Sequence, residues 1–352
     1  MREKIVMVEP EPTLDEWRSL YQAAMHFKEV APWEWMNEDE VFGIKDPETG
    51  ELGFASIMGA LGEHLSLAIY RGAAGLYTFW VYHDMGEDAP PEGIMDIPHL
   101  QAAFGNRESL DDLDRDVIKE LGLKFRGRQA WPWFRSFRPG FVPWYLEGTE
   151  ARFLTHALEQ AEDVALRFRE NPALLIFTDD DTYLIRVPHK QGKTLVWQDE
   201  VQTISPPQPE QISLFMDLEK LEKVKRLPKA KVTLEVDLIP LSFPVADEWD
   251  PRPYFPSMLL VVDGSSGMIL GTQLLRPDPT VLELFGNVPF TLVQQFASLG
   301  CIPARVKVQN DLMLGLTRKL ADELNFSLKK TAKLRFLNQV RDFLLGNTIL
   351  QE

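Results

Sequence analysis

The chain has 352 residues, a length that suits two domains. Its composition, 45% hydrophobic and 26% charged, is that of a globular protein and excludes wholesale disorder. No run approaches the roughly 18 apolar residues of a membrane-spanning helix, so we expect no membrane partner. The net charge is −16, and residues 1–229 carry −15 of it. Such a surface disfavours nucleic acid as a partner of the N-terminal part, whereas the nearly neutral residues 230–352 leave that partner open.

The cysteine content limits the chemistry further. Cys301 is the sole cysteine, so neither a disulfide within the chain nor a cysteine-based zinc site can form. It lies beside a predicted strand without any catalytic signature, which favours a small core residue over a nucleophile. The N-terminal segment has no apolar core and no cleavage site of a signal peptide. We therefore expect a cytoplasmic protein.

The first predicted elements are a helix and a group of short strands. Thr13 and Glu16 form a capping-box pattern, which predicts a helix that ends before Pro32. Apolar runs punctuated by glycines follow, and they predict an antiparallel meander. The predicted strands of this meander cover residues 41–44, 53–58, 64–70 and 75–82.

A long helix is predicted from Thr149 onward by its broad apolar face, and Asn171-Pro172 ends it. Strands are then expected at residues 173–177, 183–187 and 194–198. Three aspartates at 179–181 lie between the first two of these strands. They favour a hairpin turn, with a hard-cation site as the alternative.

The clearest domain boundary is a proline cluster at Pro206, Pro207 and Pro209, which predicts a stiff, extended connector. We expect an acidic α+β domain at residues 1–205 and a proline-rich linker and helix at 206–229. The helix within this connecting segment could pack on either domain. The second domain is predicted to cover residues 230–352.

The second domain has the predicted element order β-β-β-α-β-α-β-α. Its first three strands cover residues 231–243, 258–262 and 268–275, and the last two pairs of strand and helix lie between residues 305 and 345. Strands that alternate with helices imply parallel pairing and right-handed crossovers. The fold class is therefore α+β, with a mixed sheet in the second half.

Two parts of the chain resemble known families. The first is Trp33 to Tyr82, continued by Phe137-Arg138-Pro139-Gly140-Phe141-Val142-Pro143-Trp144. The second is Met258 to Leu345, with Val261-Val262-Asp263-Gly264 and the strand Pro303 to Val308. Together they look like bacterial and archaeal two-domain proteins in which each half is a domain of unknown function. By element order alone, the second half also resembles the ribonuclease H-like fold.

That second resemblance implies a metal-dependent nuclease as the alternative function, which would need carboxylates that bind Mg²⁺ or Mn²⁺. The acids that fit this interpretation are Asp263, Glu283, Asp311 and Asp342, with Asp263 and Asp311 as metal ligands. Simpler roles compete. Asp263 begins an Asp-Gly-Ser-Ser-Gly turn, and Asp311 stands where a helix N-cap is expected. If residues 231–243 form the first strand, Asp237 would be the expected acid instead.

The segment from residue 126 to 145 is unusually rich in interleaved aromatic and arginine residues. Such a segment can form a groove for a ligand or peptide, or it can pack an irregular loop onto a core. The candidate binding residues are Trp131, Trp133, Arg135, Arg138 and Trp144.

The functional prediction is a non-catalytic binding or interaction protein for an unknown protein or small ligand, without a cofactor. It depends on the missing phosphate-binding, dinucleotide-binding and nucleophile-elbow motifs and on histidines without metal-ligand spacing. The alternative is a divalent-metal-dependent nuclease, or a degenerate relic of one.

Overall fold

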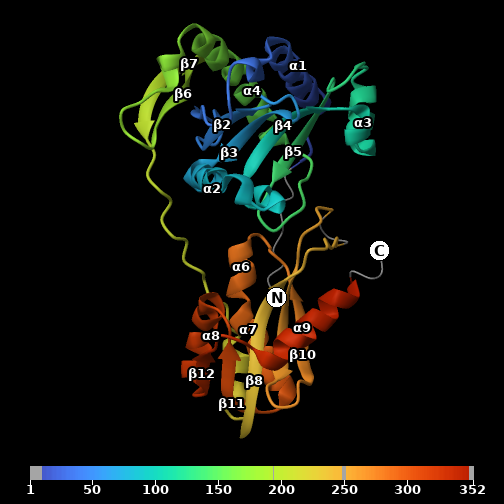
Figure 1. The fold of residues 1–352 in the computed structure, drawn as a ribbon, viewed down its shortest axis with the longest axis vertical. Helices are drawn as coiled ribbons and strands as arrows, with labels where there is room; N and C mark the ends of the chain where they lie inside the picture. Colours follow the sequence, from blue (N-terminus) through green and yellow to red (C-terminus); the bar gives the residue numbers. More distant parts are fainter. Residues whose placement is uncertain (1–9, 193, 248–250, 349–352) are drawn as a thin grey trace. The chain divides into compact units, whose positions relative to one another are not determined.

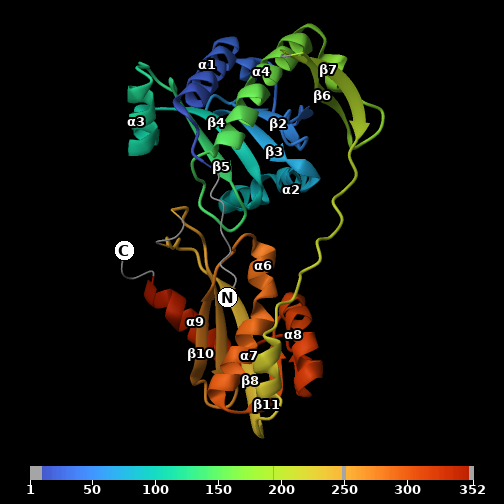
Figure 2. The same ribbon diagram turned by 180° about the vertical axis from the view of Figure 1, so that it is seen from behind.

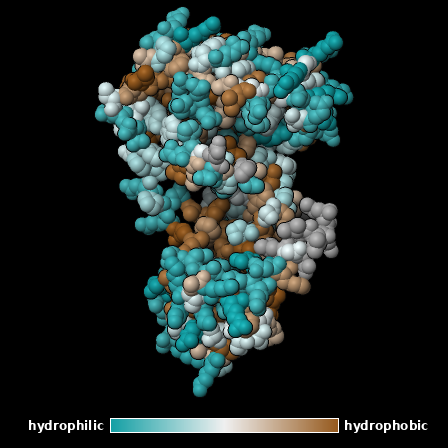
Figure 3. Space-filling view, in the orientation of Figure 1, coloured by the Kyte–Doolittle hydropathy of each residue, from teal (hydrophilic) through white to brown (hydrophobic). Residues whose placement is uncertain are grey.

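The computed structural model describes residues 10–192, 194–247 and 251–348. The chain divides into two compact units. Unit 1 comprises Met1–Pro139 and Pro143–Gln208, and unit 2 comprises Gly140–Val142 and Pro209–Glu352. The predicted α+β class with two domain-like regions is confirmed. Figure 3 shows that the visible surface of each unit is largely hydrophilic, as expected when the apolar side chains lie in internal cores.

Unit 1 is built on a mixed sheet with the strand order β5-β4-β3-β2-β1-β6-β7. Its strands are β1 (Phe42–Lys45), β2 (Leu52–Met58), β3 (Leu65–Arg71), β4 (His99–Gly105), β5 (Trp131–Phe137), β6 (Thr182–Gln191) and β7 (Thr194–Thr203). Strands β1 to β5 pair antiparallel in chain order, so the predicted meander is present. β1 and β6 pair parallel, and β6 and β7 form a hairpin.

Helices cover both faces of this sheet, as Figures 1 and 2 show. The helices of unit 1 are α1 (Leu14–Val30), α2 (Gly72–Asp84), α3 (Asp112–Glu120) and α4 (Gly148–Glu170). α1 and α4 pack on one face around the largest core, and α2 packs on the other. α1 begins with the predicted capping box, in which the Thr13 amide donates to Glu16 Oε2 at 2.7 Å.

Residues 75–82 form most of α2 and are not the predicted strand. Their aromatic and β-branched side chains favour a strand locally, but Leu76 and Phe79 lie at helical spacing. Both are buried against the sheet face that carries Phe54 and Tyr70. Packing therefore overrides local propensity here. The fourth strand of the meander is β4, which follows α2.

Residues 173–177 are also not a strand. A 3-10 turn, Pro172–Leu175, continues directly from the end of α4, because Pro172 at its first position starts a new helical turn at low cost. The three aspartates at 179–181 consequently do not join two strands. They form a turn that leads into β6, and Asp181 adopts a left-handed backbone conformation there with φ of 62°.

Unit 2 contains a mixed sheet with the order β10-β9-β8-β11-β12. Its strands are β8 (Lys229–Pro240), β9 (Ser257–Asp263), β10 (Ile269–Leu275), β11 (Ile302–Val308) and β12 (Ser327–Lys330). The first three pair antiparallel, while β8 pairs parallel with β11 and β11 with β12. The helices are α5 (Leu218–Val224), α6 (Val281–Gly286), α7 (Val288–Leu299), α8 (Asp311–Leu324) and α9 (Arg335–Thr348). From β8 onward the element order is the predicted one, except that two consecutive helices, α6 and α7, stand in place of the single helix between β10 and β11.

The cores of unit 2 lie on the two faces of this sheet. α5, α7 and α8 pack on one face, and α9 packs on the other over β8 and β9. The helix of the connecting segment is α5, which belongs to unit 2 because Leu221 and Val224 are buried in its larger core. No helix in the described ranges is long and apolar enough to cross a membrane.

A short segment between β5 and α4 belongs to unit 2. Gly140–Val142 runs beside residues 252–255, where the Val142 amide donates to the Pro253 carbonyl at 2.9 Å. The Phe255 amide donates to the Gly140 carbonyl at 2.8 Å. Phe141 is buried against Tyr254. On either side of this excursion, Ser136 and Trp144 pair through both of their backbone groups in unit 1.

Candidate binding site

The first turn of α4 folds one carboxylate back onto the start of the helix. Glu147 and Glu150 form a capping box, in which the Glu147 amide donates to Glu150 Oε2 at 3.1 Å. This pairing satisfies a backbone donor that the helix itself cannot satisfy. It also holds the Glu150 side chain in a buried position, with 4% of its surface exposed.

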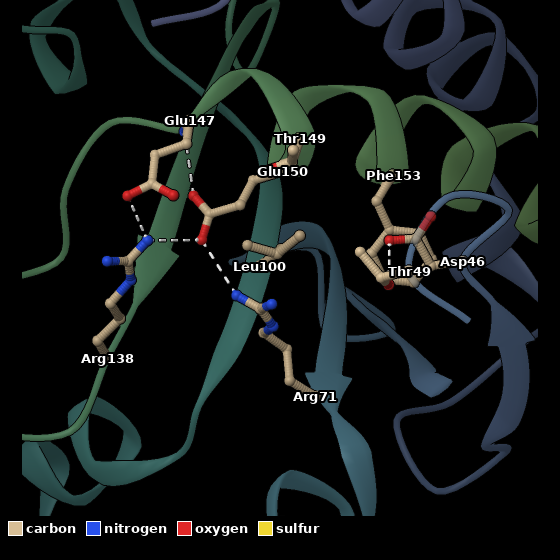
Figure 4. A pocket seen from close by; sticks show the side chains of 9 residues that line it. All are labelled: Asp46, Thr49, Arg71, Leu100, Arg138, Glu147, Thr149, Glu150 and Phe153. Atoms are coloured by element: carbon tan, nitrogen blue, oxygen red, sulfur yellow. Dashed lines mark hydrogen bonds and ion pairs between the residues drawn. The ribbon is translucent and has the colours of Figure 1, made fainter. Parts of the chain in front are cut away.

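The other oxygen of Glu150 collects three donors from two strand ends. Oε1 accepts from Ser136 Oγ at 2.9 Å. It also accepts from Arg71 Nη1 and from Arg138 Nη2, each at 3.1 Å (Figure 4). Arg71 is the last residue of β3, and Arg138 directly follows β5. A buried carboxylate needs such charge-assisted bonds, because leaving it without partners would cost several kcal/mol.

Each arginine holds a second carboxylate. Arg71 Nη2 donates to Glu51 at 2.9 Å, and Arg138 Nη2 donates to Glu147 at 2.6 Å. Burial alone would lower the pKa of Arg138, but the negative charges of Glu150 and Glu147 outweigh burial and raise it. Both guanidinium groups are therefore fixed in place and charged.

These residues form one wall of a cavity of about 170 Å³ in unit 1. In Figure 4, Leu100 and Phe153 lie between this wall and the turn after β1. In that turn, Asp46 accepts from the Thr49 hydroxyl at 2.7 Å. The lining residues are Asp46, Thr49, Arg71, Leu100, Arg138, Glu147, Thr149, Glu150 and Phe153.

The two arginines of this wall have hydrogen-bonding capacity that the described residues do not use. Within the described chain, Arg138 donates only through Nη2, so its Nε and Nη1 make no hydrogen bond. Arg71 likewise donates through its two Nη atoms and not through Nε. The lining holds three carboxylates against two guanidinium groups. The site can thus offer donors to an acceptor group, in surroundings that are slightly negative overall.

Of the predicted binding residues, the structure brings only Arg138 into this cavity. Trp131 and Trp133 project from β5 and pack, half-buried, against the main core of unit 1. Trp144 packs edge-on against the ring of Tyr145.

Arg135 serves the packing of α3 against β5. It donates to Asp111 and Asp114 at 2.8 to 2.9 Å, and its guanidinium lies 4.8 Å from the ring centroid of Tyr145. The ring of Trp133 lies on the guanidinium too, with its centroid at 5.4 Å. The predicted binding residues thus divide between packed contacts and the cavity.

Asp263, the first of the predicted metal ligands, organises its own turn. Its Oδ1 accepts from the backbone amides of Ser265 and Ser266, both at 2.8 Å, and from both hydroxyls. The Ser265 hydroxyl and the two amides lower the pKa of Asp263 to about 2. This is the local role that the Asp-Gly-Ser-Ser-Gly pattern indicates.

Asp311 does not cap α8, contrary to the prediction. Asn310 occupies the N-cap, where its side chain accepts from the Met313 amide at 2.8 Å, because the chain leaves the extended conformation one residue earlier. Asp311 is the first helical residue, and its carboxylate binds Lys330 at 2.6 Å.

The remaining acids of the nuclease hypothesis lie apart. Glu283 accepts from the Thr280 hydroxyl at the start of α6, and Asp342 pairs with its neighbour Arg341 on the surface of α9. In the described ranges, no three histidine, cysteine, aspartate or glutamate side chains lie close enough together to hold a metal ion.

Asp237 lies on β8, the first strand of unit 2, where the fold resemblance would place an acid. Its Oδ1 accepts from the Leu238 amide at 3.0 Å and from the Asn310 side chain at 3.4 Å. Burial raises the pKa of Asp237, while the Leu238 amide and the positive charge of Arg341 oppose that shift. The groups that interact with the Asp237 carboxylate are thus amide donors and the guanidinium of Arg341.

Sequence reasoning missed every lining residue of the cavity except Arg138, and among the charged ones that orient it these are Arg71, Glu147 and Glu150. The Glu-x-x-Glu spacing of Glu147 and Glu150 is a local signal for the capping box. Nothing local points to Arg71, because its partner Glu150 lies 79 residues further along the chain.

The two halves of the chain match two separate family models. Residues 17–186 match a family described as "Domain of unknown function (DUF7309)", and residues 220–345 match one described as "Domain of unknown function (DUF6930)". The predicted combination of two domains of unknown function is confirmed. No curated protein matches the chain.

Proposed function

We propose that this chain, which joins a DUF7309 domain to a DUF6930 domain, is a non-catalytic binding protein whose first domain holds a small polar ligand. The observation that carries the proposal is the cavity wall at the start of α4. There Arg71 and Arg138 are oriented by one buried carboxylate, Glu150, and each keeps an N–H group that bonds to no acceptor among the described residues. A preoriented guanidinium binds a ligand with little loss of conformational entropy.

The chemistry of the wall limits the ligand class. Guanidinium donors favour a carboxylate or phosphate, which can accept two bonds side by side. The surrounding carboxylates repel a purely anionic ligand and lower its affinity. A molecule that also carries a positive charge therefore fits the cavity better. The cavity volume is below the roughly 300 Å³ at which pockets for drug-sized ligands begin. A ligand of amino-acid size is the one we expect.

Titration calorimetry with glycine, acetate and inorganic phosphate tests this proposal. Arg138→Gln removes the donors and the charge, so we expect the affinity for the best probe to fall about tenfold or more. The matched control is Arg18→Gln, because the one partner of Arg18 among the described residues is Asp15, on the exposed face of α1. Equal affinities for Arg138→Gln and the native chain, at equal thermal stability, would contradict the proposal.

For the second domain, we propose the ribonuclease H-like fold. The support is the element order β-β-β-α-β-α-β-α, with three antiparallel strands followed by two parallel ones. The placement of Asp263, Glu283, Asp311 and Asp342 gives the nuclease alternative no support, since each has a local partner. A cytoplasmic location also remains a proposal, and the single cysteine, Cys301, supports it.

A further inference from the structure

The outer strand β10 of unit 2 presents a backbone edge without a paired strand among the described residues, and on this strand the Leu274 carbonyl accepts from the Gln273 side chain at 3.3 Å. β10 pairs with β9 on one side, and no strand of the described chain pairs with its other side. Figure 2 shows β10 at the margin of this sheet, beside α9. An unpaired strand edge offers a row of N–H and C=O groups to another strand, and proteins usually protect such edges with charges, prolines or a covering element.

β10 lacks the charges and prolines that protect the other edges. Residues 268–275 read Met-Ile-Leu-Gly-Thr-Gln-Leu-Leu and contain neither a charged residue nor a proline. The other outer strands of the two sheets each carry such residues: Pro132 and Arg135 in β5, Asp199 and Glu200 in β7, and Lys329 and Lys330 in β12.

Apolar side chains extend from the core of unit 2 onto this edge. Ile269 lies opposite Val262, and Leu274 lies opposite Met258, so both share the sheet face that α9 covers. Ile269 is nevertheless 44% exposed and Leu274 50% exposed. A register shift between Ile269 and Gly271 brings both side chains to this face. The apolar face therefore continues beyond the area that α9 covers.

The charge distribution favours a second copy of this chain as the partner that binds the edge of β10. A net charge of −16 opposes association of two copies in general, but residues 230–352 carry a net charge of only −1. Two identical uncharged strands can pair antiparallel about a twofold axis without placing like charges opposite each other. We propose that β10 pairs antiparallel with β10 of a second copy, which joins the two sheets of unit 2 into one continuous sheet.

Sedimentation velocity of the full-length chain, from low to high micromolar concentration, tests this interface. We expect a reversible dimer. Thr272→Lys places a positive charge in the middle of the edge strand, where the two copies would repel each other, so the dissociation constant should rise roughly tenfold or more. The control is Leu61→Lys, which adds the same charge at an exposed apolar residue of the turn between β2 and β3.

Hydrogen exchange gives a second readout that does not depend on a variant. The backbone amides of β10 that face away from β9 should exchange more slowly as the protein concentration rises. A chain that stays monomeric at every concentration overturns the proposal, as does a dimer that Thr272→Lys leaves unchanged. Concentration-independent exchange in β10 within a dimer would place the interface elsewhere and overturn it too.

Discussion

His99 lies at the centre of unit 1 without access to solvent. Its ring stacks on Phe137 with centroids 3.9 Å apart, and its Nδ1 lies 2.7 Å from the Ile97 carbonyl oxygen. The other ring nitrogen, Nε2, is buried and has no hydrogen-bond partner among the described residues. Burial lowers the pKa of His99 to about 4, because a charged imidazole would lose its hydration there.

This shift makes the stability of unit 1 depend on pH. The unfolded chain has a histidine pKa of about 6.5, so His99 contributes stability that is complete above that pH and is lost as pH falls toward 4. Between pH 7 and 4.5 the loss from His99 is about 2 to 3 kcal/mol. Urea unfolding at both pH values should show that the free energy of unfolding decreases less for His99→Phe than for the native chain. Equal losses would refute the assignment, since other groups titrate alike in both proteins.

At the scale of elements, α3 is attached to the edge strand β5 through one arginine. Arg135 binds Asp111, the N-cap of α3, and Asp114 in its first turn. Asp114 is only 8% exposed, so its carboxylate is largely shielded from water and contacts this guanidinium instead. The same guanidinium fills the space between two aromatic rings, which explains why an arginine stands in an aromatic segment.

Replacing Arg135 should therefore destabilise unit 1 rather than remove a ligand contact. Arg135→Gln leaves Asp114 buried without a cation, and we expect the free energy of unfolding to fall by about 3 kcal/mol. Arg18→Gln, which breaks the exposed pair with Asp15 on α1, should cost less than about 1 kcal/mol. Chemical denaturation of both variants measures the difference, and similar costs would argue against a buried network.

At the scale of the whole molecule, the segment Gly140–Val142 makes unit 2 discontinuous in sequence. A fragment that contains only residues 209–352 lacks Phe141. We expect its free energy of unfolding to be about 3 kcal/mol lower than that of unit 2 in the full chain. Hydrogen exchange should show faster exchange at the Val245 and Tyr254 amides, which pair with each other beside this segment.

Adding back the missing residues provides the control for that experiment. A peptide of residues 138–144 should slow exchange at these two amides, whereas the same peptide with Phe141→Ala should have little effect. A fragment that is as stable as the full chain would show that the segment contributes nothing to unit 2.

Local chemistry explains which parts of the fold could be predicted from the sequence. The capping box at Thr13 and the alternation of strands and helices after residue 230 are each encoded within a few residues. Residues 75–82 were predicted wrongly, because their helix depends on burial of Leu76 and Phe79 against distant strands. Local propensity carries no information about such packing.

The candidate site also combines a residue that the sequence predicts with residues that only the fold brings together. Arg138 was predicted as part of a groove within an aromatic and arginine-rich segment, whereas it lines a cavity together with residues of other elements. The cavity depends on Glu150, whose partners come from β3, from β5 and from the residue after β5. No short pattern brings these strand ends to the first turn of α4, so the site becomes visible only in the fold.

The discontinuity of unit 2 also bears on how such a chain is made and inherited. During synthesis, Gly140–Val142 leaves the ribosome well before Pro209. This segment therefore cannot pack in its final place until the strands of unit 2 have been synthesised. A gene that is divided within the proline-rich connector would encode the second domain without Gly140–Val142, which is part of its fold. A protein that carries that domain by itself would need other residues to occupy the place beside Tyr254, and the two halves cannot be exchanged as independent cassettes.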